Sequence, residues 1–246
     1  MPSTFTSHVS RRAAAELLGT GLLVAVVVGS GIAAQTLSPA DTGLQLLENS
    51  LVTALGLTVL ILAFGPISGA HFNPIVSAVD WVLGRRFGKG LRPLELGIFV
   101  VAQIIGAISG ALLANAMFEV PTTMATTERA SAGHLLGEVV ATAGLVFLIF
   151  ALVRTNRAAL AAPAVGAYIG AAYWFTSSTS FANPAVTIGR MFSDTFAGIA
   201  PTSVLPYIAA QLIGAVVGAA LTVLLYPSAG RAAGHVVVPS SLRSTS

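Results

Sequence analysis

The sequence contains no cysteine and very little charge, and each absence excludes classes of function. With no Cys among 246 residues, disulfides, thiolate metal sites and cysteine nucleophiles are all excluded. Only 9% of the residues are charged, whereas a soluble domain carries about 25%. The formal net charge is only +3, and the basic residues lie in short segments between the hydrophobic stretches. We therefore expect no basic face that could bind nucleic acid. Because His and Asp are not clustered either, we expect neither an enzyme nor a bound metal or cofactor.

Hydrophobic residues are abundant instead, at 55% of the chain, and they gather in six long stretches. Each stretch is close to the ~20 residues that an α-helix needs to cross ~30 Å of hydrocarbon. The first is longer than the apolar core of a signal peptide and five more follow it, so we interpret it as a span. The sequence therefore predicts an all-α membrane protein, surrounded by lipid, with six transmembrane helices. The stretches are residues 13–34, 50–67, 94–117, 134–153, 158–176 and 204–226.

Basic residues are distributed unevenly between the two sides of such a protein. The N-terminus, the segments after the second and fourth stretches and the C-terminus share one side, and they hold ten of the twelve Lys and Arg residues. Only Arg129 and Arg190 fall on the other side. By the positive-inside rule, we expect a multi-pass protein of the inner (plasma) membrane with both termini cytoplasmic. Residues 228–246 are expected to form a flexible cytoplasmic tail.

The two halves of the sequence resemble each other within one domain of residues 1–246. Three matches keep their order along the chain. They pair Glu16 to Thr20 with Glu138 to Thr142, Asn73-Pro74 with Asn183-Pro184, and Gln103 to Gly110 with Gln211 to Gly218. Each half, about residues 11–117 and 131–226, contains three of the six stretches. Because that number is odd, the second half enters the membrane from the opposite side, which makes an inverted repeat.

An Asn-Pro pair lies between the second and third stretch of each half, ahead of about ten helix-compatible residues. Asn73 and Asn183 suit helix N-caps, and Pro74 and Pro184 suit the first helical turn. Ten helical residues reach only ~15 Å, half the hydrocarbon thickness. Two re-entrant half-helices that enter from opposite sides would meet at their N-termini. Non-helical backbone is tolerated at that depth only along a water-filled path, so the sequence predicts a pore.

The predicted meeting point has a chemistry of its own. Two positive helix-dipole ends converge there and disfavour a cation or hydronium. The amides of Asn73 and Asn183 can donate hydrogen bonds to a passing oxygen and so interrupt a chain of proton-conducting waters. We therefore expect a neutral hydroxylated solute to pass this point and a proton to be excluded.

These motifs, the approach from Ser68 to Pro74, and the Gln-x-x-Gly frames resemble the major intrinsic protein family, the aquaporins and aquaglyceroporins. The resemblance covers about residues 11–226. It implies a right-handed bundle of six helices with two half-helices and one pore per subunit. It also implies small neutral solutes as cargo and usually a homotetramer.

Three ionisable residues fit this resemblance. Glu16 and Glu138 lie on the sides from which their re-entrant loops enter, so we expect them to accept hydrogen bonds from loop backbone. The alternative is a carboxylate that reaches headgroup water. His71 is similar to the family's loop histidine on the cytoplasmic half of the pore, and a buried structural role is its alternative.

The sequence departs from the family at the outer constriction. Water-selective members have an aromatic residue, a His and an Arg there, and the Arg directly follows the second motif. Here that position is Val186. Counting along the family pattern puts Thr53, Ala171 and Ser180 in the same ring, although a one-residue gap would move Thr53 or Ala171. The expected selectivity filter is small, uncharged and partly hydroxylated, and therefore wider than a filter for water alone.

Two further positions depart from the pattern. Ile75 stands where the family has Ala, and we expect it beside the pore, where it either repacks or narrows the centre. Arg190 lies one helical turn beyond Val186, which suggests a displaced filter arginine. Because Asp194 follows four residues later, we interpret Arg190 as half of a surface ion pair.

Several functions remain open at this point. A filter with Val in place of Arg resembles that of bacterial members associated with arsenic detoxification, which implies arsenous acid or methylated arsenicals as cargo. The pore chemistry alone indicates a small uncharged polyhydroxy solute, so a glycerol or water facilitator without an arsenic role is the alternative. A more distant alternative is an inverted-repeat secondary transporter, which would require more ionisable residues inside the membrane.

Overall fold

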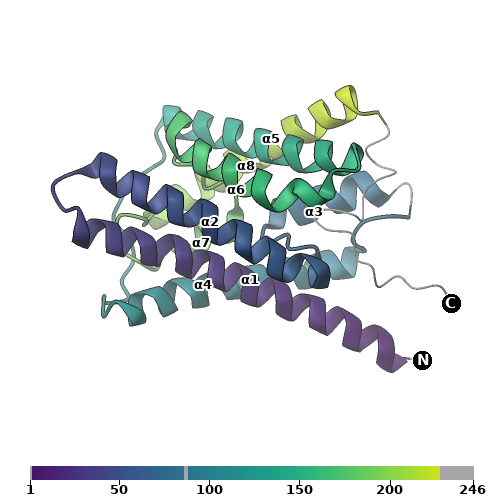
Figure 1. The fold of residues 1–246 in the computed structure, drawn as a ribbon, viewed down its shortest axis with the longest axis horizontal. Coiled ribbons are helices and arrows are strands. Elements are labelled where there is room, and N and C mark those ends of the chain that lie inside the picture. Colours follow the sequence, from purple (N-terminus) through teal and green to yellow (C-terminus); the bar gives the residue numbers. More distant parts are fainter. Residues whose placement is uncertain (1, 86–87, 228–246) are drawn as a thin grey trace.

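The computed structural model describes residues 2–85 and 88–227, and within them it contains helices and no strand. The predicted tail, residues 228–246, lies outside the described residues. Figure 1 shows the long helices side by side, with the start of α1 and the end of α8 toward the same end of the molecule. The helices are α1 (Pro2–Leu37), α2 (Thr42–Ser68), α3 (Pro74–Gly84), α4 (Pro93–Met117), α5 (Ala132–Arg154), η2 (Ala158–Leu160), α6 (Ala161–Phe175), α7 (Pro184–Arg190) and α8 (Pro201–Leu225).

Among the described residues, six helices are long and apolar enough to cross a membrane, which confirms the predicted all-α architecture. Large hydrophobic side chains remain exposed along these helices. Such a surface suits hydrocarbon rather than water. The spans are His8–Leu37, Thr42–Ser68, Pro93–Met117, Ala132–Arg154, Ala158–Phe175 and Pro201–Leu225.

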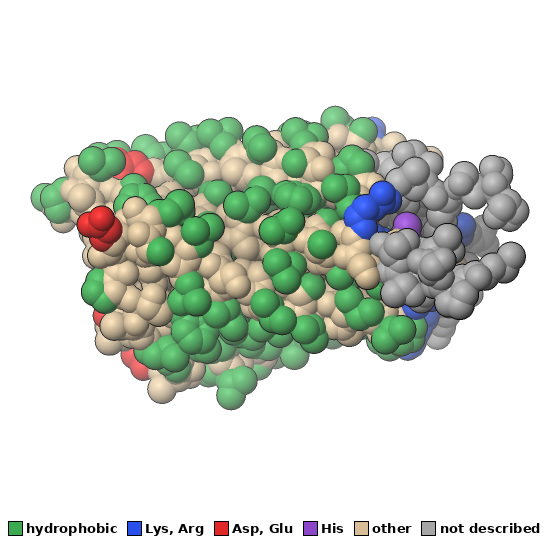
Figure 2. All heavy atoms as spheres, turned by 90° about the horizontal axis from the view of Figure 1, so that it is seen from below, with side chains coloured by type: hydrophobic (Ala, Val, Ile, Leu, Met, Phe, Trp, Pro, Cys, Tyr) green, Lys and Arg blue, Asp and Glu red, His purple; other side chains and the backbone are tan. Residues whose placement is uncertain are grey.

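Charged side chains gather at the two ends of the molecule. On the face drawn in Figure 2, acidic residues lie at one end, Lys and Arg lie toward the other, and a hydrophobic surface separates them. The basic end is the one that holds the start of α1. It is called the terminal end here, and the opposite end is called the outer end. That the terminal end is cytoplasmic stays a prediction of the positive-inside rule.

The two short helices begin at the Asn-Pro motifs. Asn73 Oδ1 accepts a hydrogen bond from Ile75 N (2.9 Å), and Asn183 Oδ1 accepts from Ala185 N (3.0 Å). Figure 1 shows α3 toward the terminal end and α7 toward the outer end. α3 has 11 residues, but α7 has only 7, fewer than expected. It ends early because Met191 N turns back to the carbonyl of Ile188 instead of continuing the helical pattern.

Glycines allow the helices within each half to approach closely. In the first half, a Cβ added to Gly110 of α4 would meet the carbonyl oxygen of Gly21 of α1. In the second half, a Cβ added to Gly218 of α8 would lie 2.5 Å from the carbonyl oxygen of Ala143 of α5. The matched Gly frames therefore set the helix spacing in both halves, as is typical of helix packing in lipid.

We expect Gly110→Ala to destabilise the protein by about 1–3 kcal/mol, because its methyl group overpacks the α1–α4 contact. Gly97→Ala, on the same helix, is the matched control, since a Cβ there has no neighbour within 4 Å. The melting temperatures of the two variants are compared in detergent, where unfolding is followed as the loss of soluble protein on heating. Equal melting temperatures for both variants would contradict this account of the packing.

Candidate functional site

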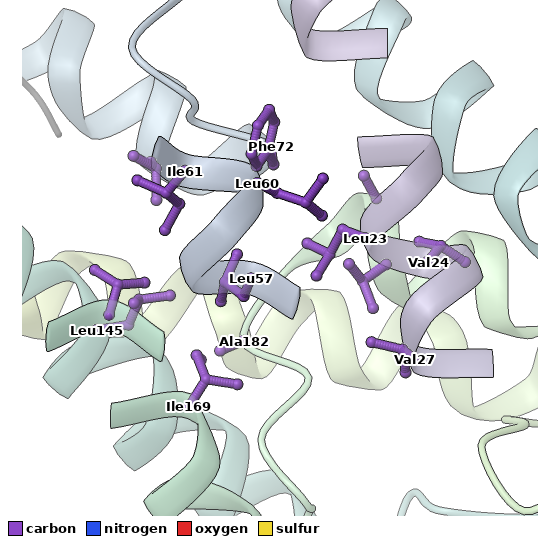
Figure 3. Close-up of a cluster of buried hydrophobic side chains, with 14 of the residues drawn as sticks. Leu23, Val24, Val27, Leu57, Leu60, Ile61, Phe72, Leu145, Ile169 and Ala182 are labelled. Atoms are coloured by element: carbon purple, nitrogen blue, oxygen red, sulfur yellow. The ribbon is translucent and has the colours of Figure 1, made fainter. Parts of the chain in front are cut away.

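A narrow cavity of about 60 Å³ runs between the two halves of the molecule. A water needs roughly 10–15 Å³ of such volume, so the cavity holds only a short file of waters. Figure 3 shows part of its apolar wall, together with Phe72 and Ala182 of the two re-entrant loops. The wall includes Leu23, Val27, Leu57, Ile61, Leu145 and Ile169.

The two asparagines line this cavity and each bonds to the loop of the other half. Asn73 Nδ2 donates to the carbonyl of Ala182 (2.8 Å), and Asn183 Nδ2 donates to the carbonyl of Phe72 (2.7 Å). Each side chain therefore caps its own half-helix and fastens the opposite loop. One amide hydrogen on each asparagine has no partner within the described residues and is available to a molecule in the cavity.

The loops before the half-helices have the same unusual backbone. Ala70 and Phe72 have φ of 49° in the first half, and Ser180 and Ala182 have φ of 49° and 46° in the second. Each residue other than glycine in this left-handed region costs about 1–3 kcal/mol, so the surrounding contacts must hold it. The inverted repeat therefore extends to the loop conformation.

Glu16 supplies those contacts in the first half. It is fully buried. Its Oε1 accepts from Ser68 Oγ (2.6 Å) and His71 N (3.0 Å), and its Oε2 accepts from Phe72 N (2.7 Å) and Gln103 Nε2 (2.8 Å). Four donors thus surround one carboxylate at the depth of the loop. That these contacts support the loop stays a prediction.

Glu138 makes the matching contacts in the second half. Its Oε1 accepts from Phe181 N (2.9 Å), and its Oε2 accepts from Ala182 N (2.9 Å) and Gln211 Nε2 (2.6 Å). Gln211 also donates to Thr187 Oγ1 (2.9 Å) on α7. From the sequence alone, the Gln-x-x-Gly frames predict only close helix packing. Their pairing with the two Glu motifs was the available signal that Gln103 and Gln211 also hold the loops.

His71 and Ile75 lie on different sides of the first motif. His71 lines the cavity, with Nδ1 3.0 Å from Ser77 Oγ and its ring edge-on to Phe99. Ile75 does not line the cavity and is buried in the hydrophobic core, so the expectation of a pore-lining Ile75 is wrong. Val76 faces the cavity instead, because the next residue on a helix points about 100° away.

Three of the four expected filter residues line the outer half of the cavity, namely Thr53, Ser180 and Val186. Ala171 does not: its side chain is exposed on the outside of α6. Tyr173 lies in the cavity wall, with its hydroxyl 3.3 Å from Thr53 Oγ1. A shift of two residues turns a helical side chain by about 200°. The family pattern, applied without a gap, therefore selected the wrong face of α6 at Ala171.

Arg190 also lines the cavity, so its interpretation as a surface ion pair is wrong. It is only 2% exposed, its Nε donates to the carbonyl of Ala197, and its Cζ lies 3.5 Å from the centre of the Phe181 ring. Asp194 instead accepts from the backbone N (2.9 Å) and the Oγ1 (3.1 Å) of Thr126. The segment after α7 thus folds back and keeps Asp194 away from Arg190.

Comparisons with known proteins agree with this geometry. The sequence matches the family model described as Major intrinsic protein over residues 3–180 and 162–245. It is 48% identical to "Aquaglyceroporin AqpS" of Rhizobium meliloti (strain 1021), over 87% of this chain and 89% of the relative. It is 30% identical to "Probable aquaporin AqpM" of Archaeoglobus fulgidus, over 90% and 97%. The X-ray structure of the aquaglyceroporin from Plasmodium falciparum shares the fold, with a TM-score of 0.63, 20% identity and 89% and 95% coverage.

Proposed function

The chain belongs to the major intrinsic protein family, whose aquaporins are passive channels and not enzymes, and from this premise we propose that it conducts small uncharged solutes that carry several hydroxyl groups. Glycerol and arsenous acid are the two candidate solutes, and water would accompany them. The relative named an aquaglyceroporin supports this solute class. An arsenic role is a further part of the proposal and depends on Val186 in the filter.

The observation that carries the proposal is the pair of crossed asparagines in a narrow, mostly apolar cavity. Each offers a free amide hydrogen where two half-helices begin. A neutral hydroxylated solute can accept these hydrogen bonds in place of water. A cation gains nothing from them, because amide hydrogens and the helix N-termini both carry partial positive charge.

The filter residues support a solute with polar and apolar sides. Thr53 and Tyr173 bring two hydroxyls together, and Ser180 Oγ has no hydrogen-bond partner within the described residues. Val186 contributes an apolar surface to the same cavity. Such a ring can hydrogen-bond the hydroxyls of a solute on one side while its carbon or arsenic centre slides along the other.

Three roles of the site are part of the same proposal. Glu16 and Glu138 support the re-entrant loops, and His71 lines the half of the pore toward the terminal end. We also propose that the protein forms a homotetramer in the plasma membrane with cytoplasmic termini. The exposed hydrophobic side chains of the long helices support burial in lipid or against neighbouring subunits.

We expect purified protein in lipid vesicles to pass glycerol and arsenous acid without a proton current. Solute flux should rise linearly with concentration, because a channel has no saturable transport cycle, and a pH-sensitive dye inside the vesicles should show no proton entry. Protein-free vesicles are the control. Saturating flux coupled to proton movement would favour the secondary transporter. If the vesicles pass water but neither glycerol nor arsenous acid, the protein is a water channel and the proposed solute class is wrong.

A further inference from the structure

A second cavity, of about 340 Å³, lies beyond the filter at the outer end of the pore and is called the outer vestibule. Tyr173 and Arg190 belong to the walls of both cavities, so they mark the boundary between vestibule and pore. Arg129 and His134 also line the vestibule, and none of its lining residues within the described part of the chain is a carboxylate. Both basic residues that the sequence places on this side of the membrane therefore lie at one entrance.

Both guanidinium groups are fixed by the same short segment. Arg190 Nε donates to the carbonyl of Ala197, while Arg129 Nε donates to Gly198 O (2.7 Å) and Arg129 Nη2 to Phe196 O (3.0 Å). The Arg129 Cζ lies 5.5 Å from the centre of the Phe181 ring, the same ring that Arg190 covers. The two charges are thus held in place around one aromatic side chain.

No carboxylate forms an ion pair with Arg190 within the described residues, and Glu138 attracts it only through space. Glu138 is occupied by loop backbone and Gln211. Glu128 accepts from Thr202 Oγ1 and Ser203 Oγ, and Asp194 accepts from Thr126. The C-terminal end of α7 supplies only a partial negative charge.

Arg190 also has hydrogen-bond donors that are not used within the described residues. With Nε bonded to Ala197, the two terminal amino groups have no hydrogen-bond partner in the part of the chain that the structure describes. A buried cation without a directly bonded carboxylate is costly. Its unpaired donors therefore favour a ligand that brings both negative charge and acceptor oxygens.

We propose that Arg190, with Arg129 beside it, forms an anion-recognition site at the outer boundary of the pore and sets its charge selectivity. A small planar oxoanion fits the fork of a guanidinium, which donates two parallel hydrogen bonds. The site repels cations before they reach the asparagines. An anion bound there stands in the path of neutral solutes, so it slows them. The inference rests on the proposed pore, because it needs solutes to enter past Arg190.

Nitrate is the probe, since it is planar, monovalent and ionised at neutral pH. Glycerol uptake by vesicles containing the full chain is followed by light scattering in sodium nitrate or sodium gluconate at equal ionic strength. We expect nitrate, and not the bulky gluconate, to slow uptake in a saturable way. Arg190→Gln should raise the nitrate concentration for half-inhibition about tenfold or more, the effect of losing one charged hydrogen-bonding group. Arg190→Lys should raise it less.

Two controls separate charge at this site from charge elsewhere and from misfolding. Arg157→Gln removes an exposed arginine at the terminal end, so its nitrate sensitivity should equal that of the unmodified protein. If Arg190→Gln does not fold, Thr179→Asp adds a carboxylate to the vestibule wall and leaves Arg190 in place. It should weaken nitrate inhibition, whereas Thr179→Asn, without the charge, should retain it.

The outcomes for the pore and for the anion site are distinguishable. If the unmodified protein passes water but not glycerol, the proposed cargo is wrong, and nitrate inhibition is measured on water flux instead. If solute or water flux is normal but nitrate acts no more strongly than gluconate, the anion site is overturned. Equal nitrate sensitivity in the folded Arg190→Gln or Thr179→Asp variant and the unmodified protein would overturn it as well.

Discussion

Val186→Arg is expected to reduce glycerol and arsenous acid flux about tenfold or more, equivalent to ~1.4 kcal/mol or more on the barrier. Val186 is 5% exposed and lines the narrow cavity, so a guanidinium there adds several heavy atoms to the constriction. Arg190 lies one turn further on the same wall and would repel it. Water is smaller and should be slowed less, so the ratio of water to glycerol permeability should rise. Stopped-flow light scattering on vesicles measures both fluxes.

Val186→Ala is the matched control for this prediction. It leaves the constriction open and removes no hydrogen bond, because Val186 bonds to Asn183 only through its backbone N (3.3 Å). Solute flux should therefore stay near that of the unmodified protein. A folded Val186→Arg variant with unchanged glycerol flux and an unchanged permeability ratio would mean that residue 186 does not line the constriction.

Glu138→Gln should destabilise the protein by about 1–3 kcal/mol, the cost of leaving a buried hydrogen-bond donor without an acceptor. The amide group of Gln keeps one acceptor oxygen and replaces the other with donors. One of the donors now on Glu138, namely Phe181 N, Ala182 N or Gln211 Nε2, would then face another donor. We expect a lower thermal midpoint in detergent and, in protein that survives reconstitution, reduced solute flux.

The control for this variant is Glu119→Gln, because Glu119 is an exposed acidic residue after α4. It makes the same chemical change at the surface, so its thermal midpoint should match that of the unmodified protein. Glu16→Gln should behave like Glu138→Gln, since its carboxylate has four donors. A Glu138→Gln protein as stable as Glu119→Gln would show that the carboxylate does not hold the loop.

The helices and the two half-helix starts could be predicted from the sequence because their causes are local. A span is a matter of apolar length, and an Asn followed by Pro carries its cap and its first turn within two residues. The structure has Asn73 and Asn183 in those cap positions. The sequence also predicts that Glu16 and Glu138 accept hydrogen bonds from loop backbone, for a related reason. A carboxylate inside a span needs donors, and the nearest loop offers backbone N–H groups.

The wall of the outer pore could not be predicted in the same way, because its residues depend on chain segments distant from one another. The packing of α6 against α2 turns Tyr173 toward Thr53 and leaves Ala171 exposed, and counting residues along the chain does not reveal this packing. For Arg190, the spacing to Asp194 suggested an exposed pair. The fold-back of the chain after α7 instead supplies the carbonyl of Ala197 and draws Asp194 to Thr126.

The hydrogen bonds of the crossed asparagines can form only after most of the protein has been synthesised. Asn73 bonds a carbonyl 109 residues later in the chain, and Asn183 bonds one 111 residues earlier. At about 5–20 residues per second, roughly 5–20 s pass before the first loop can meet its partner. During that interval the amide of Asn73 lacks the carbonyl of Ala182 as its acceptor. A chain truncated before Ala182 never gains this acceptor, so we expect it to be degraded rather than to accumulate.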